Sequence, residues 1–545
     1  MRLRLRRGFI VAPRKYRMPE LAWQGGIDYG ALESAPESYK WWLNCFGYLR
    51  CLLRGDFAAA DRAIVRAIVS DWMAKNPRGA PASGRAWDGH AVALRARVLG
   101  EVFLRGEDWL RPLLAEHAAF LAADENYQGH WNHGVDQSIA LVDVAQALGL
   151  PECARIGADR LAGALTTVVD EQGATIEQAI SYQLYSYKQL ATAVDRLRAV
   201  GVDADVTDRW NRMPLFLAHA TRPDGTYFCL GDTEVQAATA IPGTAAEYAA
   251  TQGREGIEPA HSVAVYERAG YVFGRSGWGR RRPFAEETAF ALRFGPPRAI
   301  HGHLDHTSLT YFSRGTEILR DGGFHGYTDD AVRAHLRAPA AHNVAMCTDP
   351  ARRALNPHTT LSRQSLDPRF CHLRMEDEPS IGVRRRRDVV VFFEPECVVV
   401  MDRLDAATPV RFQQVWHFGD QCELVPMDDT SYRDERLGFT VRQLWPLDDL
   451  EHLPAGSGRQ VALCAGAAMY DTCFAPTLVA TRHGRQAKFL TVFTFDEAGI
   501  PLHVHSDLVR SGGVRRQLQV SSPAWVGRVT QFEDGELACE VAEAG

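Results

Sequence analysis

Three short stretches of the chain concentrate polar side chains that could bind charged groups or transfer protons. The first is Trp131-Asn132-His133, which opens an apolar helical pattern and is followed by Asp136. Asn132 and Asp136 are four residues apart, so a helix places them on one face, away from Val135. The same residues are as typical of an N-cap asparagine with a solvated first turn.

The second stretch, 177–185, begins with Glu177 and places Tyr182 and Tyr185 one helical turn apart. An aromatic pair at this spacing is more common in a core than in a catalytic site, because tyrosine buries a large apolar area. A catalytic function for either tyrosine therefore needs support from other residues.

The third stretch is the densest in ionisable groups. It consists of His301-Gly302-His303-Leu304-Asp305-His306, then Arg320-Asp321-Gly322-Gly323, Tyr327 and Ala341-His342-Asn343. Imidazole nitrogens and one carboxylate suit a zinc-type cation. His-x-His alone is weak evidence, since alternate residues of a strand simply share a face. A two-residue turn at Gly315-Thr316 would place Asp321 opposite Thr310, so spacing alone does not bring Asp321 to His303.

Two kinds of element must position these side chains. From about Ser38 to Gly253, apolar residues recur at helical spacing and are interrupted by Gly, Pro and Asp-Gly, which predicts stacked antiparallel helical hairpins. After about Pro259, short segments rich in Val, Phe and Thr, such as Val389–Phe393, predict a large antiparallel β-sandwich. The polar segment 250–262 reads as a linker. We expect an N-terminal arm over 1–37, a helical domain over 38–255 and a sandwich domain over 262–545.

Composition narrows the class of protein. The 545 residues are 46% hydrophobic and 23% charged, as in an ordinary soluble globular protein. Lys and Arg number 61 against 67 Asp and Glu, which leaves no basic excess for a phosphate backbone, so nucleic acid is not an expected partner. The 11 cysteines form no C-x-x-C pair and indicate neither a disulfide framework nor a cysteine zinc site.

Hydrophobic runs are too short for targeting or membrane segments. The basic first residues contain only the apolar run Phe9–Ala12, shorter than a signal-peptide core of about 7–15 residues. The run Val389–Phe393 is well below the roughly 18 residues that a membrane span needs. We therefore expect a cytoplasmic protein without a membrane partner; a misassigned start site would leave a periplasmic location open.

The ordered set of motifs resembles the heparinase II/III family of polysaccharide lyases. The motifs are W-N-H, E-x-x-x-x-Y-x-x-Y, H-x-H-x-D with R-D-G-G, and A-H-N, and the likeness extends over roughly residues 40–410. It implies an incomplete N-terminal α/α toroid followed by a C-terminal antiparallel β-sandwich. This agrees with the helical and strand patterns described above.

The resemblance also implies residue functions. Asn132 and His133 would bind and neutralise a uronate carboxylate, Tyr182 would be the catalytic tyrosine, and His301 and Tyr327 would be further residues of the cleft. Asp136 occupies a position where relatives can carry an acidic residue behind the substrate contacts.

The family likeness further implies a metal set of His303, Asp321 and His342, holding one divalent ion, with zinc the best fit, in a structural role. Two departures leave the substrate preference open. Ala179 replaces a serine of many relatives, and His306 follows Asp305 where a polar or aliphatic residue is commoner.

The implied reaction is β-elimination in a uronic-acid-containing poly- or oligosaccharide, which leaves a 4,5-unsaturated uronate. The C5 proton is weakly acidic because it lies beside an ionised carboxylate, so Asn132 and His133 would cancel that charge and stabilise the enolate. Tyr182, with an ordinary pKa near 10, acts as a base if cations favour its phenolate or if proton transfer is concerted. It can then protonate O4 in a syn elimination, whereas His301 or Tyr327 would be the acid on the opposite face.

Two alternatives stay open at this stage. A glycoside hydrolase on the same scaffold needs two carboxylates across a sugar, for which Glu177 and Asp136 are the obvious pair. A glycan-binding or assembly protein would keep the fold without turnover. The residues do not decide which uronate glycan is bound, whether cleavage is endolytic or exolytic, or whether the chain forms a homo-oligomer. A cytoplasmic location favours oligosaccharides over an extracellular polymer.

Overall fold

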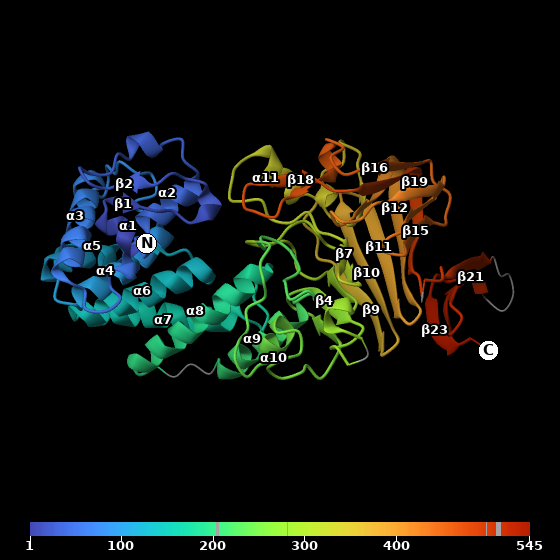
Figure 1. The fold of residues 1–545 in the computed structure, drawn as a ribbon, viewed down its shortest axis with the longest axis horizontal. Helices are drawn as coiled ribbons and strands as arrows, with labels where there is room; N and C mark the ends of the chain where they lie inside the picture. The colour runs from blue at the N-terminus through green and yellow to red at the C-terminus, as the bar shows by residue number, and fades with distance from the viewer. Residues whose placement is uncertain (203–205, 281, 498, 508–513, 545) are drawn as a thin grey trace. The chain divides into compact units, whose positions relative to one another are not determined.

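A computed structural model describes residues 1–202, 206–280, 282–497, 499–507 and 514–544 (Figure 1). Its contacts divide the chain into two compact units. The first comprises 1–177, 182–213 and 326–330, and the second comprises 178–181, 214–325 and 331–545. Residues 178–181 belong to the second unit and residues 326–330 to the first, so the two units are not separated at one position in the sequence. The domain ranges expected from the sequence, 38–255 and 262–545, stay a prediction.

The helical part is built of antiparallel neighbours. Its main helices are α2 (Glu37–Asn44), α3 (Ala59–Lys75), α4 (Gly89–Phe103), α5 (Arg111–Ala122), α6 (Asn132–Leu148), α7 (Pro151–Val168), α8 (Ile180–Ala199), α9 (Thr207–His219) and the short α10 (Ala245–Ala250). The side chain of Asp88 caps α4 by accepting from the backbone N–H groups of His90 and Ala91. Gly149, with φ of 72°, ends α6, and Pro151 begins α7 two residues later.

This short connection makes α6 and α7 antiparallel neighbours. Val135, Ile139 and Val142 of α6 share one buried cluster with Leu161 and Leu165 of α7. The cluster continues into α8 through Leu190, Ala193 and Leu197. Side-chain hydrogen bonds from Tyr185 to Asp136 and from Gln189 to the carbonyl of Asn132 also join α8 to α6.

The N-terminal residues are folded onto this helical part. They form α1 (Arg2–Arg6) and the two-stranded pair of β1 (Phe9–Ile10) and β2 (Leu21–Ala22). Arg2 and Arg6 both bind the buried carboxylate of Asp61 in α3, at 2.6 and 2.8 Å. A buried carboxylate requires such partners.

The C-terminal part consists of antiparallel sheets. A five-stranded sheet runs β3 (Val263–Tyr266), β4 (Tyr271–Arg275), β5 (Ala289–Arg293), β6 (Leu309–Ser313) and β7 (Thr316–Leu319) in spatial order. A ten-stranded sheet has the order β13-β14-β15-β19-β12-β11-β10-β9, with β16 paired to β19 and β8 to β12. Its strands are β8 (Ala345–Cys347), β9 (Thr360–Asp367), β10 (Phe370–Ser380), β11 (Val383–Phe393), β12 (Glu396–His417), β13 (Val425–Asp428), β14 (Ser431–Asp434), β15 (Phe439–Gln443), β16 (Asp449–Leu453) and β19 (Thr477–Phe495).

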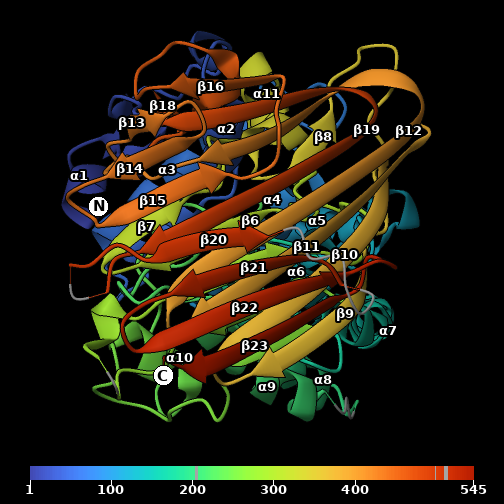
Figure 2. The same ribbon diagram turned by 90° about the vertical axis from the view of Figure 1, so that its right-hand side faces the viewer.

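A four-stranded sheet closes the chain, made of β20 (His503–Asp507), β21 (Val514–Ser521), β22 (Trp525–Phe532) and β23 (Leu537–Glu543). It lies across the ten-stranded sheet (Figure 2). The turn between β6 and β7 is Arg314-Gly315, both with positive φ, one residue earlier than the sequence indicated.

The ten-stranded sheet is covered on both faces, which explains its most apolar segment. Val389 and Val391 of β11 pack with the five-stranded sheet, whereas Val390 and Phe392 pack with the four-stranded sheet. Successive side chains of a strand point to opposite faces, so a strand buried on both sides needs a continuous apolar run. The predicted order of helices followed by an antiparallel sandwich is thus confirmed. Among the described residues, no helix combines the length and apolarity that crossing a membrane requires.

Candidate functional site

The N-terminal turn of α6 holds Asn132 in a buried hydrogen-bonded pair. The backbone N–H of Asn132 donates to Oε1 of Glu177 at 2.8 Å, and its Nδ2 donates to Oε2 at 2.5 Å. Asn132 is 1% exposed. Burial raises the pKa of Glu177 to about 7 despite these two donors. The alternative of an N-cap asparagine with a solvated first turn is wrong, since Trp131 is the cap residue and the first turn is mostly buried.

His133 lies in an aromatic stack beside Asn132. Its ring lies 3.9 Å from the ring of His90 in α4 and 3.9 Å from the ring of Trp131, measured between centroids. Nδ1 of His133 is 2.8 Å from the amide oxygen of Gln128. These contacts fix the plane of a half-buried imidazole.

Asp136 connects α4, α6 and α8 one turn further along. His90 Nε2 is 2.9 Å from its carboxylate, and the Tyr185 hydroxyl donates to the same oxygen. Burial opposes ionisation of Asp136, but the hydrogen bonds from His90 and Tyr185 outweigh it and lower the pKa. Gln189 of α8 donates to the carbonyl of Asn132 at 2.6 Å. Hydrogen bonds from Tyr185 and Gln189 of α8 thus hold the first two turns of α6.

Tyr182 and Tyr327 meet, although 145 residues separate them. Their hydroxyl oxygens lie 2.5 Å apart, and both residues belong to the first compact unit. Tyr182 lies in the first turn of α8, with its ring centroid 6.2 Å from that of Tyr185. Tyr327 is 39% exposed, so this pair is accessible to solvent, unlike Asn132.

In the second unit, Asp232 organises the His301–His303 segment. Its two carboxylate oxygens lie 3.0 Å from Nδ1 of His301 and 3.0 Å from Nε2 of His303. Arg333 donates to the same two oxygens, at 2.5 and 2.7 Å. Burial would raise the pKa of Asp232, but these hydrogen bonds hold it well below its ordinary value.

Two glycines, Gly231 and Gly302, let the backbone pass close to neighbouring groups around Asp232. Gly231 has φ of 58°, and a Cβ there would lie 2.3 Å from the carbonyl oxygen of Gln178 and 2.8 Å from that of His301. The backbone N–H of Asp232 donates to the carbonyl of His301 at 2.9 Å. Gly302 is equally crowded, since a Cβ would lie 2.2 Å from Oε1 of Gln178. Only glycine fits these two contacts.

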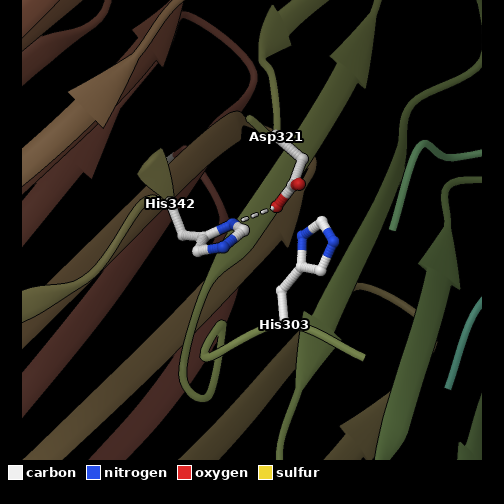
Figure 3. A group of neighbouring side chains, drawn as sticks. All are labelled: His303, Asp321 and His342. Carbon is white, nitrogen blue, oxygen red and sulfur yellow. Dashed lines mark hydrogen bonds and ion pairs between the residues drawn. The ribbon is translucent and has the colours of Figure 1, made fainter. Parts of the chain in front are cut away.

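The predicted metal set of His303, Asp321 and His342 converges in space (Figure 3). One potential ligand atom from each residue lies within 4.8 Å of the others, and all three residues are buried. Nδ1 of His342 is 2.8 Å from Oδ2 of Asp321. Nδ1 of His303 and Nε2 of His342 are buried without a hydrogen-bond partner in the described part of the chain. Two such nitrogens beside a carboxylate fit a divalent cation.

Sequence reasoning missed Asp232 and Arg333 and assigned Tyr185 no function. Asp232 lies in the turn Gly231-Asp232-Thr233, which follows the apolar run Tyr227–Leu230. An acidic residue in a turn after an apolar run could have marked Asp232 as a candidate site residue. Nothing distinguishes Arg333 from the chain's other arginines. The departures Ala179 and His306 are both buried, and His306 Nε2 is 2.8 Å from the carbonyl of Pro296.

Comparison with known proteins identifies the C-terminal part. Residues 266–445 match the model of the heparinase II/III-like C-terminal domain. These residues are thus similar to that domain. This confirms the family resemblance that the motifs indicated. No curated relative matches the chain.

Solved structures share the fold of this chain over nearly its whole length. A mutant of heparan sulfate lyase HepC from Pedobacter heparinus is 15% identical, with a TM-score of 0.69, and the match covers 99% of this chain and 88% of that one. Heparinase III is 14% identical, with a TM-score of 0.74 and coverage of 96% and 86%. Chondroitin AC lyase from Streptomyces coelicolor A3 is 12% identical, with a TM-score of 0.53 and coverage of 92% and 85%. The fold is that of an incomplete α/α toroid followed by an antiparallel β-sandwich.

Proposed function

We propose that this protein is a polysaccharide lyase that cleaves a uronic-acid-containing glycan by β-elimination and leaves a 4,5-unsaturated uronate. The proposal is supported by the heparinase II/III-like domain and by structural neighbours that are heparan sulfate and chondroitin lyases. Fold alone does not fix activity, so the argument depends on the side chains.

The contact between Tyr182 and Tyr327 is the observation that carries this proposal. A hydrogen bond of 2.5 Å between two phenols lets one hydroxyl donate to the other oxygen as negative charge develops there. The hydrogen bond from Tyr327 favours the phenolate form of Tyr182, and this phenolate takes the C5 proton and becomes a neutral phenol. The C5–H electron pair forms the C4–C5 double bond, the C4–O bond breaks, and the leaving oxygen takes the proton.

Asn132 and His133 are proposed to neutralise the C6 carboxylate. The amide nitrogen of Asn132 donates to Glu177, and this hydrogen bond fixes the orientation of the amide group. His133 presents an imidazole whose plane is fixed by His90 and Trp131. Donors held in place before reaction stabilise an enolate without reorganising at the moment of proton transfer. His301, 7% exposed and held by Asp232, is proposed as a further donor to the substrate.

The hydrolase alternative is disfavoured by the surroundings of its two carboxylates. Glu177 is fully buried and binds Asn132 through both oxygens. Asp136 is 3% exposed and is used by His90 and Tyr185. Glycoside hydrolysis needs two carboxyl groups that reach opposite faces of one sugar.

We also propose that His303, Asp321 and His342 hold one divalent cation, with zinc the best match to their ligand atoms. Asp232 accepts from Nε2 of His303, which leaves Nδ1 unprotonated as a metal ligand requires. The three side chains are buried, so the function assigned to the ion is structural. It would fix the segment that carries His301.

Incubation with a panel of uronate polymers and oligosaccharides tests the proposed reaction. A lyase generates the ultraviolet absorbance of the conjugated double bond in step with new reducing ends. A hydrolase generates reducing ends without the absorbance, and a binding protein generates neither. Heparan-like, chondroitin-like and alginate-like chains in the panel would identify the substrate.

A further inference from the structure

One face of the ten-stranded sheet changes from apolar to cationic within two residues along the neighbouring strands β12 and β19. Met401 of β12 and Leu490 of β19 belong to the core beneath the four-stranded sheet. Two residues along each strand, Arg403 pairs directly with Lys488, and Arg386 of β11 pairs with Arg403. Cross-strand partners lie on the same face, so three cations stand in one row.

This row lines a cavity of about 360 Å³, which we name the sandwich pocket. Arg482 of β19, which pairs with Asp448 at 3.1 Å, and Arg515 and Arg516 of β21 complete its basic lining. The guanidinium of Arg516 lies 5.3 Å from the centroid of the Trp445 ring, a contact that positions it. The volume is in the range of pockets that hold small ligands.

The pocket's cations are only partly neutralised by the chain. Arg386 and Arg403 form ion pairs with Asp388 and Asp405, at 3.1 and 2.9 Å. Lys488, Arg515 and Arg516 have no carboxylate within 4.0 Å in the residues that the structure describes.

Other carboxylates at the pocket do not reach these three cations. Asp402 forms an ion pair with Arg387 at 2.7 Å. Glu533 and Asp534 also line the pocket, but within the described residues neither forms an ion pair with one of its cations. Burial and the nearby Arg515 and Arg403 lower the pKa of Lys488. Three cations without an ion pair therefore line the pocket beside two carboxylates without one, which leaves an excess of positive charge among the described residues.

Like charges directly opposite each other destabilise a sheet, so this arrangement costs stability in the unliganded protein. A bound anion removes that cost and forms charge-assisted hydrogen bonds. We propose that the sandwich pocket binds the carboxylate or sulfate groups of a uronate-containing glycan, through residues other than those of the proposed lyase reaction. The choice of a glycan rests on the proposed function, whereas the choice of an anion rests on the pocket alone.

Calorimetric titration of the full chain tests this inference. The proteins carry Tyr182→Phe to prevent turnover, and the probe is a sulfated heparin hexasaccharide. The double variant Lys488→Ala/Arg516→Ala should weaken binding at one site by about tenfold or more for each lost cation. The control Arg353→Ala removes an exposed arginine outside the pocket and should bind as the parent does.

Equal affinity and stoichiometry in the double variant and the parent would overturn the inference. So would an equal loss in Arg353→Ala, tighter binding of a DNA oligonucleotide than of the hexasaccharide, or inorganic sulfate binding as tightly as the hexasaccharide. Because the substitutions relieve repulsion, the double variant should unfold at a temperature no lower than its parent. Lys488→Gln, which removes the charge but keeps part of the side-chain stem and a polar end, repeats the test if the double variant does not fold.

Activity measurements separate this inference from the proposed function. Without Tyr182→Phe, the pocket variants should form the unsaturated product from short oligosaccharides at the parental rate. A wild-type chain that binds the hexasaccharide in the pocket but forms no unsaturated product would contradict the lyase proposal. The proposal that the sandwich pocket binds a glycan would still hold.

Discussion

Single side chains of the candidate site are held by partners that leave little freedom. His133 lies between two aromatic rings, and Asn132 is bound to Glu177 through its backbone and side chain. Such fixation suits groups that must meet a developing charge in one geometry. We therefore expect His133→Ala and Asn132→Ala to have different effects on activity and stability.

Substitution of His133 by alanine should lower kcat by about 10²–10³, the effect of losing one donor to a developing oxyanion. Exposed His130, three residues earlier, provides the matched control, since His130→Ala should leave kcat unchanged. Steady-state kinetics on the substrate found in the panel gives the comparison. Equal rates in wild type and a folded His133→Ala variant would remove His133 from the site.

Asn132→Ala should reduce kcat and also stability. It leaves an oxygen of the buried Glu177 without its donor, which costs about 1–3 kcal/mol. Chemical denaturation reports the second effect. An Asn132→Ala variant as stable as wild type would show that this buried pair contributes nothing to the fold.

Glu177 should give the protein a distinctive pH dependence. Its pKa is about 7 in the folded state, above its ordinary value, so between pH 4.5 and about 7 the folded state binds more protons than the unfolded state. Glu177 thus makes stability fall as pH rises through this window, by up to about 3 kcal/mol. Glu177→Gln should remove this component from unfolding curves measured across the window. Parallel pH profiles for variant and wild type would refute the assignment.

Among the elements, the three residues proposed to hold a metal ion come from three separate segments of the sandwich. His303 lies in the loop before β6, Asp321 follows β7, and His342 follows η7 (Pro339–Ala341). Spacing did not predict this convergence, because register carries Asp321 past the end of the β6–β7 pairing. The family resemblance predicted it, and the buried nitrogens of His303 and His342 now support it.

Purified protein should contain about one equivalent of zinc, and a chelator should lower its melting temperature. A ligand at 100 to 1,000 times its Kd stabilises by about 3–4 kcal/mol. His342→Ala should abolish both the zinc content and the chelator effect, whereas His358→Ala, at an exposed histidine, should change neither. Metal-free wild-type protein with an unchanged melting temperature would contradict the site.

For the whole molecule, the periodicity of apolar residues predicted the helical and β-sheet parts. It did not predict the long-range side-chain contacts of the candidate site. Asn132 and Asp136 were placed on one face by their spacing, and both are buried on α6. By contrast, nothing local links Tyr182 to Tyr327, or Asp232 to His301, because tertiary packing sets such contacts. The segments 178–181 and 326–330, which change unit, could not be inferred from composition. The cytoplasmic location, a homo-oligomer and the lack of a nucleic-acid partner stay predictions.

The most direct test of the account is product formation by Tyr182→Phe beside Tyr187→Phe. Both residues lie on α8, and Tyr187 stacks on Trp210 rather than meeting Tyr327. Phenylalanine keeps each ring and deletes only the hydroxyl. We predict that Tyr182→Phe keeps its melting temperature and glycan affinity but forms no unsaturated product, whereas Tyr187→Phe remains active. A Tyr182→Phe variant that forms this product at the wild-type rate would contradict the account.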